Sequence, residues 1–240
     1  MLVSHRKHFI YTKTAKIAGT SVESYFEKYC MPEGEWKETH LSEEYVSDTG
    51  IIGYRGSRGK GLTYYNHMSA DSIRNLVGQD IWNSYFKFTV IRNPYDKLIS
   101  WFAMCEQQKQ NYDLRTRAKC SLKRLLRRGN PSDRVKGRTD VERFRSWIHL
   151  GGTIDDRDKY LVGGKVCVDY FIRFENLQED VHHVCDRLSI PYIPENIPSF
   201  KKGIRSSRLK VRDYFDEGTK RIVEKNYAWE IEHFGYSFPE

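Results

Sequence analysis

The chain has 240 residues, of which 39% are hydrophobic and 30% are charged, and its formal net charge is +8. This length suits one large domain or two small ones, and no stretch approaches the roughly 18 consecutive apolar residues of a membrane span. The excess of basic residues favours an anionic partner: a nucleic acid, a membrane surface, an anionic small molecule or a glycan.

Apolar runs and helical periodicities alternate along the chain. The candidate strands, rich in β-branched and aromatic residues, are His8 to Thr14, Ile51 to Tyr54 (the weakest), Phe86 to Ile91 and Val166 to Phe174. Apolar residues spaced by three and four predict helices over 22–29, 73–81, 95–102, 177–188 and 223–234. This alternation favours an α/β fold with a central parallel β-sheet flanked by helices, and we expect a single domain over residues 1–240.

The first candidate ligand site follows the first strand. Residues 16–21 stand between a strand and a helix, where free backbone N–H groups and the helix dipole attract an anion. Gly19 permits a close backbone approach, Lys16 supplies a positive charge, and the hydroxyls of Thr20 and Ser21 supply donors. Those hydroxyls could instead only cap the helix. The segment lacks the G-x-x-x-x-G-K-[ST] pattern of a Walker A loop, which disfavours a nucleoside triphosphate with magnesium.

A second cationic group follows the strand that ends at Ile91. Arg92 comes directly after it, Pro94 suits the first turn of a helix, and Ser100 lies eight residues beyond Arg92. If the turn folds back, Arg92 and Ser100 meet on one face; otherwise Arg92 pairs with Asp96 and Ser100 faces solvent. Ligands of α/β folds bind beyond the carboxyl ends of the strands, so two such ends favour a ligand with two separate phosphates.

Taken together, these segments resemble a known family. Residues 16–21 are similar to the PKTAGTS loop of sulfotransferases that use 3′-phosphoadenosine 5′-phosphosulfate (PAPS), and residues 92–100 resemble their RNPYDRLVS segment. Residues 169–177 resemble the passage D-x-I-x-x-E-x-L, and residues 227–236 resemble the closing Y-x-x-D-x-x-x-F-G-Y of the carbohydrate branch, which is the Golgi-type family 2. The order and the separation of the segments also fit, so the resemblance covers most of the chain.

The resemblance implies a P-loop-like nucleotide-binding fold and a role for each matching residue. The residues that would bind the 5′-phosphate bearing the sulfo group are Lys16, Ala18, Gly19, Thr20 and Ser21. Arg92 and Ser100 would bind the 3′-phosphate. As the sulfuryl group leaves, charge grows on the bridging oxygen, and a lysine beside that oxygen stabilises it. Lys13 is a rival for this lysine, but Lys16 has the family's spacing to Gly19.

The acceptor hydroxyl needs a base, and a histidine suits this task because its ordinary pKa of about 6.5 leaves it neutral at physiological pH. His67 follows a glycine-rich turn and precedes the helix expected over 73–81. This place in the chain is similar to that of the base in several carbohydrate sulfotransferases. His67 could instead cap that helix, and His40 and Glu23 are further candidates for the base.

Two basic segments remain. The first, Lys201 to Arg208, stands where the family has a loop that closes over the nucleotide, so Arg205 or Lys202 would reach the 3′-phosphate or the adenosine; a solvated basic loop is the alternative. The second, Arg115 to Arg138, holds ten Lys or Arg and a single acid. It lacks the interleaved aromatic residues of a single-strand binder, so we assign it to an acidic acceptor; a solvated basic helix and loop is the alternative.

The cysteines and the first residues bear on cofactors and location. Five cysteines are an odd number and form no C-x-x-C pair, so neither a zinc site nor a redox motif is indicated, and we expect no metal and reduced, mostly buried thiols. Residues 1–8 hold no apolar core of the signal-peptide type, so the chain as given is expected to be cytoplasmic.

The sequence therefore predicts a PAPS-dependent sulfotransferase that releases 3′,5′-adenosine bisphosphate. Its acceptor is expected to carry a hydroxyl, and the candidates include carbohydrates, among them acidic glycans, and small molecules. A P-loop-like nucleotide kinase and a basic nucleic-acid-binding protein are the alternatives. On the leading hypothesis, neither a nucleic-acid partner nor a membrane span is expected.

Overall fold

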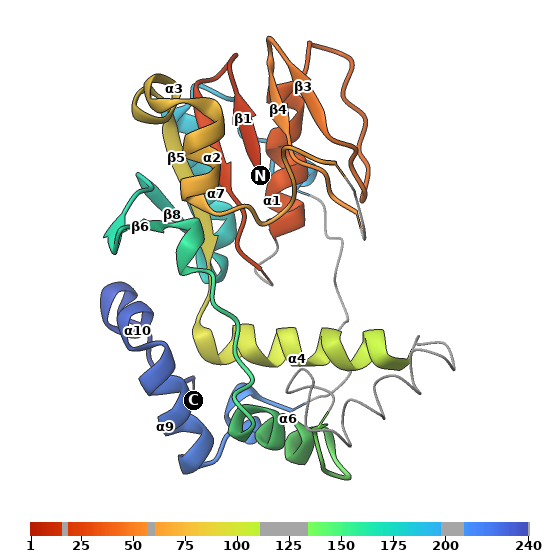
Figure 1. The fold of residues 1–240 in the computed structure, drawn as a ribbon, viewed down its shortest axis with the longest axis vertical. Helices are drawn as coiled ribbons and strands as arrows, with labels where there is room; N and C mark the ends of the chain where they lie inside the picture. The colour runs from red at the N-terminus through yellow and green to blue at the C-terminus, as the bar shows by residue number, and fades with distance from the viewer. Residues whose placement is uncertain (16–18, 57–60, 111–133, 198–208, 240) are drawn as a thin grey trace. The chain divides into compact units, whose positions relative to one another are not determined.

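The computed structural model describes residues 1–15, 19–56, 61–110, 134–197 and 209–239. The chain forms two compact units, one from Met1–Arg92 and Asp155–Lys202 and the other from Asn93–Ile154 and Gly203–Glu240. The ribbon in Figure 1 shows the elements of both units. The expectation of one domain over residues 1–240 stays a prediction.

The first unit is built on a six-stranded sheet with the order β3-β4-β1-β2-β5-β8. The strands are β1 (Leu2–Ser4), β2 (Phe9–Thr12), β3 (Tyr45–Ser47), β4 (Gly50–Ile52), β5 (Phe86–Ile91) and β8 (Tyr170–Arg173). Strands β2, β5 and β8 are parallel, and β1, β3 and β4 join the sheet antiparallel. The expected parallel sheet is therefore right for one half and wrong for the other, because short hairpin loops join β1 to β2 and β3 to β4 and can connect only antiparallel strands.

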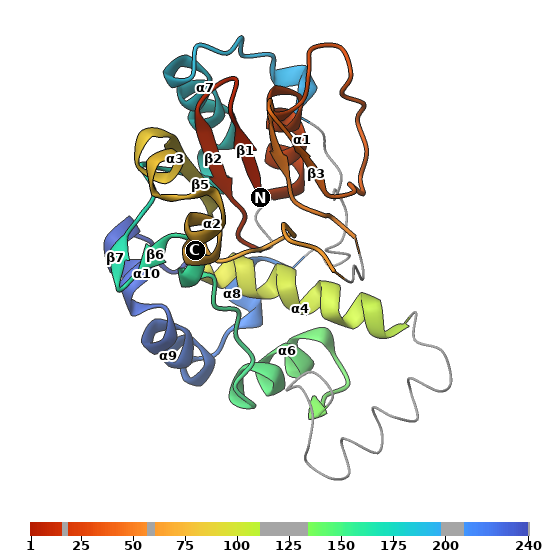
Figure 2. The same ribbon diagram turned by 45° about the horizontal axis from the view of Figure 1, so that its top comes forward.

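Helices cover both faces of this sheet (Figures 1 and 2). The helices of the first unit are α1 (Gly19–Glu27), α2 (Ala70–Val77), α3 (Gln79–Ser84) and α7 (Leu177–Arg187), with short 3₁₀ turns at Lys28–Cys30, Arg157–Lys159, Phe174–Asn176 and Pro194–Asn196. Residues alternate between the faces: Phe9 and Tyr11 pack with α1 and α7, whereas Ile10 packs with α2 and α3. This alternation places one hydrophobic core on each side of β2.

Two expected elements are interrupted. The helix expected over 73–81 is divided into α2 and α3 at Gly78, whose φ of 86° a helix cannot contain. The strand expected over Val166 to Phe174 is divided between β8 and β7 (Lys165–Val166), which forms a small hairpin with β6 (Leu161–Val162). Both breaks shorten elements that the sequence pattern presents as continuous.

The second unit is helical. It contains α4 (Pro94–Gln110), α6 (Asp140–His149), α8 (Val211–Tyr214), α9 (Glu217–Asn226) and α10 (Ala228–Phe234). Aromatic rings fill its interior, where Phe144 contacts Phe102, Trp147 and Phe215 edge-on or tilted. Figure 2 shows α6 beside α8 and α9, with which it packs. The helix expected over 223–234 is divided between α9 and α10 at Tyr227.

The described ranges also show the state of the cysteines and the apolar character of the helices. None of the cysteines in those ranges forms a disulfide; Cys30 and Cys185 are buried, and Cys105 and Cys167 are half-buried. None of the helices described here combines the length and the apolar character that a membrane span requires.

Candidate active site

The carboxyl end of β2 is held on the neighbouring strand by two threonine hydroxyls. Thr89 of β5 donates to the backbone oxygen of Thr12 at 2.7 Å, and Thr14 donates to the backbone oxygen of Val90 at 2.6 Å. Thr12 and Thr89 are partners in the parallel pairing of β2 with β5, and Thr14 lies two residues beyond the end of β2. The backbone that leads into the expected phosphate loop therefore starts from a fixed position.

Asp156 holds the next residue of this segment. Its carboxylate accepts a hydrogen bond from the backbone N–H of Ala15 at 3.0 Å, and its side chain is buried. Gly19 then begins α1, and Thr20 and Ser21 lie in its first turn. The structure thus confirms the strand that precedes the expected loop and the helix that follows it.

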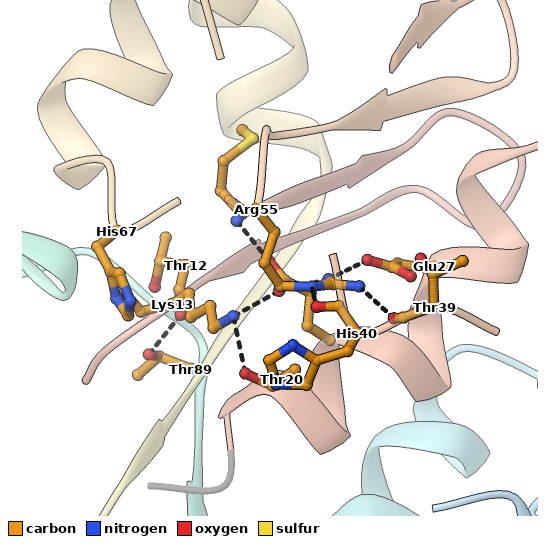
Figure 3. Close-up of polar contacts among 11 residues, drawn as sticks. Thr12, Lys13, Thr20, Glu27, Thr39, His40, Arg55, His67 and Thr89 are labelled. Atoms are coloured by element: carbon orange, nitrogen blue, oxygen red, sulfur yellow. Dashed lines mark hydrogen bonds and ion pairs between the residues drawn. The ribbon is translucent and has the colours of Figure 1, made fainter. Parts of the chain in front are cut away.

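Lys13 lies in this segment with its ammonium group inside the protein. The residue is 2% exposed, and Nζ lies 2.6 Å from Glu23 Oε2 and 3.3 Å from Thr20 Oγ1 (Figure 3). Both partners belong to α1. A carboxylate within the fold therefore balances the charge of Lys13. In this respect Lys13 differs from a lysine whose ammonium group faces a ligand.

Glu23 is the centre of a buried ion cluster. Its carboxylate accepts hydrogen bonds from Lys13, from Arg55 at 2.7 Å and from the Met1 nitrogen at 2.8 Å. Burial alone would raise the pKa of Glu23, but these cations hold that pKa well below its usual range. Glu23 is thus ionised, fully enclosed and already paired, which removes it from the candidates for a base that an acceptor must reach.

Arg55 extends the cluster toward a neighbouring loop. Its guanidinium group also pairs with Glu27 and donates to the backbone oxygens of Thr39 at 2.9 Å and His40 at 2.8 Å (Figure 3). The side chain of Arg55 is buried, whereas Thr39 and His40 are exposed. This arrangement ties the loop before β3 to α1, and it holds His40 by its backbone.

The His67 ring is held by the backbone of Lys13. Nδ1 lies 3.1 Å from the Lys13 carbonyl oxygen, which can only accept, so Nδ1 carries the proton and Nε2 has a free lone pair. Burial and the Lys13 cation lower the pKa of His67 to about 4. Nε2 makes no hydrogen bond to the residues that the structure describes. The ring is thus neutral at physiological pH and presents an accepting nitrogen.

The backbone of His67 is unusual and does not serve the following helix. Its φ of 61° is in the left-handed region, where non-glycine residues are uncommon and are often found at functional sites. Ser69 caps α2 instead, because its hydroxyl accepts the N–H of Ser72 at 3.1 Å. The alternative that His67 caps this helix is therefore wrong.

The residues expected at a second phosphate are divided between the two units. Arg92 ends the first unit after β5, and its guanidinium lies 4.1 Å from the ring centre of Phe174, which follows β8. Ser100 is on α4 in the second unit, and its side chain is half-buried. That Arg92 and Ser100 bind one phosphate stays a prediction.

Several expected site residues lie outside the described residues: Lys16, Ala18, Lys202, Arg205 and most of the window Arg115 to Arg138. The described part of the chain contains no group of His, Cys, Asp and Glu that could hold a metal ion. Sequence reasoning missed Arg55, Asp156 and Phe174, because none belongs to a motif and each acts on a residue far away in the sequence.

Comparison with known proteins supplies the family. A family model described as the sulfotransferase family matches residues 1–237. The chain belongs to this family. Carbohydrate sulfotransferase 10 of Xenopus laevis is 24% identical over 199 residues, which cover 75% of this chain and 54% of that protein. This match confirms the resemblance to the carbohydrate branch of the sulfotransferases.

A second relative is an uncharacterized protein of Archaeoglobus fulgidus, 27% identical over 124 residues, which cover 52% of this sulfotransferase chain and 84% of that protein. The chain spans about half the length of the Xenopus relative. No solved structure matches the chain significantly.

Proposed function

We propose that this sulfotransferase transfers the sulfuryl group of PAPS to an acceptor hydroxyl, with His67 as the base. The observation that carries the proposal is the state of the His67 ring. It is neutral, it is held in one tautomer by the Lys13 carbonyl oxygen, and its Nε2 is free to accept a proton. It stands beside the strand end that leads into the phosphate loop, where both reacting groups would meet.

The proposed reaction is an in-line transfer. The acceptor oxygen forms a bond to sulfur while the bond from sulfur to the 5′-phosphate oxygen breaks, and the acceptor proton passes to His67 Nε2. Lys16 and the free N–H groups at the start of α1 stabilise the charge that develops on the leaving phosphate. The products are the sulfated acceptor and 3′,5′-adenosine bisphosphate. This division of labour requires positioning and fixed charges rather than a metal.

The other candidates for the base are less suited. Glu23 is enclosed, and its oxygens are occupied by Lys13, Arg55 and the Met1 nitrogen. His40 is exposed, so water competes for its ring, and Arg55 binds the His40 backbone oxygen. A base must hold its accepting atom in one direction, and the hydrogen bond of Nδ1 to the Lys13 carbonyl oxygen does this for the His67 ring.

We propose a carbohydrate hydroxyl as the acceptor. The name of the Xenopus relative supports this class, and the net charge of +8 favours an acidic glycan over a neutral one. The basic window from Arg115 to Arg138 is the segment we assign to such an acceptor. Reversing the charges of Arg127 and Arg128 should weaken acceptor affinity, and unchanged affinity would refute this assignment.

Calorimetric titration tests the donor. The protein is titrated with 3′,5′-adenosine bisphosphate, with AMP and with ATP and magnesium. We expect binding that requires the 3′-phosphate, because Arg92 and Ser100 are proposed to bind it. A preference for ATP with magnesium, or no binding of any of these nucleotides, would overturn the proposal.

Substitutions test the assigned roles. Lys16→Ala and Arg92→Ala should abolish transfer while the fold survives, with Lys37→Ala, at an exposed lysine, as the matched control. His67→Ala should lower kcat by about 10²–10⁴-fold with little change in nucleotide affinity, as removal of a general base does. His182→Ala, at an exposed histidine of α7, should retain full activity. An equal loss of turnover and nucleotide affinity in His67→Ala would identify a structural role.

A further inference from the structure

Lys13 makes different contacts through its side chain and its backbone. Nζ donates to Glu23 and to Thr20 Oγ1, whereas the carbonyl oxygen accepts from His67 Nδ1. Figure 3 shows the extended side chain reaching Thr20 and the His67 ring lying near the backbone of the same residue. Thr20 belongs to the proposed phosphate loop and His67 is the proposed base, so one residue contacts both halves of the reaction.

We propose that Lys13 is a positioning residue that couples the two halves of the site: its ammonium directs the Thr20 hydroxyl toward the 5′-phosphate, and its carbonyl directs the His67 ring toward the acceptor. This inference rests on the proposed function, and it assigns to Lys13 a role other than that of the lysine beside the leaving oxygen. That lysine has to face the ligand, whereas the Lys13 ammonium is enclosed and paired with Glu23 at 2.6 Å.

The contact with Lys13 decides the direction in which the Thr20 hydroxyl hydrogen points. A lysine ammonium has three donors and no acceptor, so Thr20 Oγ1 must accept the bond from Lys13. The hydroxyl hydrogen of Thr20 therefore points away from Lys13, and no described residue accepts it. A hydroxyl fixed in this way is a donor for an anion at the start of α1. Without Lys13 the same hydroxyl would be free to rotate.

The Lys13 carbonyl oxygen is held in place by contacts on both sides. The hydroxyl bonds of Thr89 to the backbone of Thr12, and of Thr14 to the backbone of Val90, hold the peptides on either side of Lys13 against β5. The Lys13 carbonyl oxygen is therefore a rigid acceptor for His67 Nδ1. Since this acceptor belongs to the backbone, substitution of the side chain leaves it in place. Changes at the Lys13 side chain should therefore disturb nucleotide binding through Thr20.

A double-mutant cycle on the full chain tests this coupling. Lys13→Met keeps the length of the side chain and removes its donors, and Thr20→Val removes the hydroxyl. Each change should weaken binding of 3′,5′-adenosine bisphosphate by about tenfold, the effect of losing a hydrogen bond to a charged group. The double variant should bind no more weakly than either single variant, because Lys13 acts through Thr20. Additive losses would overturn the inference.

Glu27→Gln is the matched control. It removes a charge from the same buried cluster, through Arg55, without touching Lys13 or Thr20. Its nucleotide affinity should equal that of the wild type even though its stability falls; a tenfold loss of affinity would show that the cluster acts by general destabilisation and would overturn the inference. If Lys13→Met does not fold, Lys13→Arg replaces it in the cycle, since this variant keeps the charge but moves the donors.

The acid limb of the pH–rate profile gives a second readout. The charged groups that act on the ring of His67 are Lys13, the Met1 nitrogen and Asp156. Removal of the Lys13 ammonium should move the limb to higher pH, whereas Glu27→Gln should leave it in place; an unmoved limb in Lys13→Met would count against the coupling. If the wild type itself does not bind 3′,5′-adenosine bisphosphate, the proposed function fails. If it binds and the two losses add, the inference alone fails.

Discussion

His67 should act as a base over a wider acid range than an ordinary histidine. Burial, together with the Lys13 cation, lowers its pKa from 6.5 to about 4. At pH 5.5 a histidine of ordinary pKa is about 90% protonated, whereas a histidine of pKa 4 is only about 3% protonated. Between pH 7.5 and 5.5 an ordinary base would therefore lose about tenfold in rate, and His67 should lose almost none.

The assay is kcat/KM for the acceptor, measured at saturating PAPS from pH 4.5 to 8. Saturation matters because the 3′-phosphate of the free nucleotide titrates near pH 6 and would add a limb of its own. The wild type should be flat from pH 7.5 to 5.5 and fall only at lower pH, and His67→Ala should lack this limb. A limb centred near pH 6.5 in the wild type would refute the reasoning from burial.

Three further predictions concern stability and nucleotide binding. Because the unfolded chain binds the His67 proton near pH 6.5 and the folded chain only near pH 4, acidification through this window should destabilise the wild type by about 3 kcal/mol more than His67→Gln in urea unfolding. Phe174→Ala should weaken binding of 3′,5′-adenosine bisphosphate by roughly fivefold, leaving AMP unaffected, since a cation–π contact of about 1 kcal/mol holds Arg92; Phe174→Tyr should retain the affinity. Arg55→Met should lower the unfolding free energy by about 3–5 kcal/mol, and a loss below about 1 kcal/mol would contradict the role of the buried cluster.

The sequence predicted the strand and the helix on either side of the expected phosphate loop, and the second strand end, because each is a local pattern. A strand of apolar residues, a turn and an amphipathic helix all fall within a few residues of Gly19 and of Arg92, and β2, α1, β5 and α4 follow this order. Two strands of the six-stranded sheet were missed, β1 and β3; each is three residues long, which is too short to show a periodicity. The connections of these short strands are also what makes half of the sheet antiparallel.

Contacts over long separations could not be predicted in this way. Arg55 is 32 residues from Glu23 in the chain, and Asp156 is 141 residues from Ala15. An isolated arginine or aspartate in a loop indicates a solvated residue when only its neighbours in sequence are known. Arg55 follows β4, which the sheet order brings near β2, and Asp156 is placed by its hydrogen bond to the Ala15 N–H.

The position of His67 in the chain made it a candidate for the base, but its tautomer and its pKa could not be predicted from the sequence. The tautomer depends on a backbone oxygen 54 residues earlier, and the lowered pKa depends on burial and on the Lys13 charge. A histidine just before a predicted helix can also be its cap, and only the structure shows that Ser69 takes that position.

The buried ion cluster has a consequence for protein engineering. If the segment expected to bind phosphate were transplanted to another scaffold, it would bring Lys13, Thr20 and Glu23 with it and would leave Arg55 and the Met1 nitrogen behind. Glu23 would then lose two of its cations, Arg55 and the Met1 nitrogen, and Glu27 would lose the guanidinium with which it pairs. The smallest segment set that can be moved to another protein is therefore the one that keeps these buried charges paired, and it is larger than the motif. For the same reason, libraries that vary Glu23, Glu27 and Arg55 should vary them jointly.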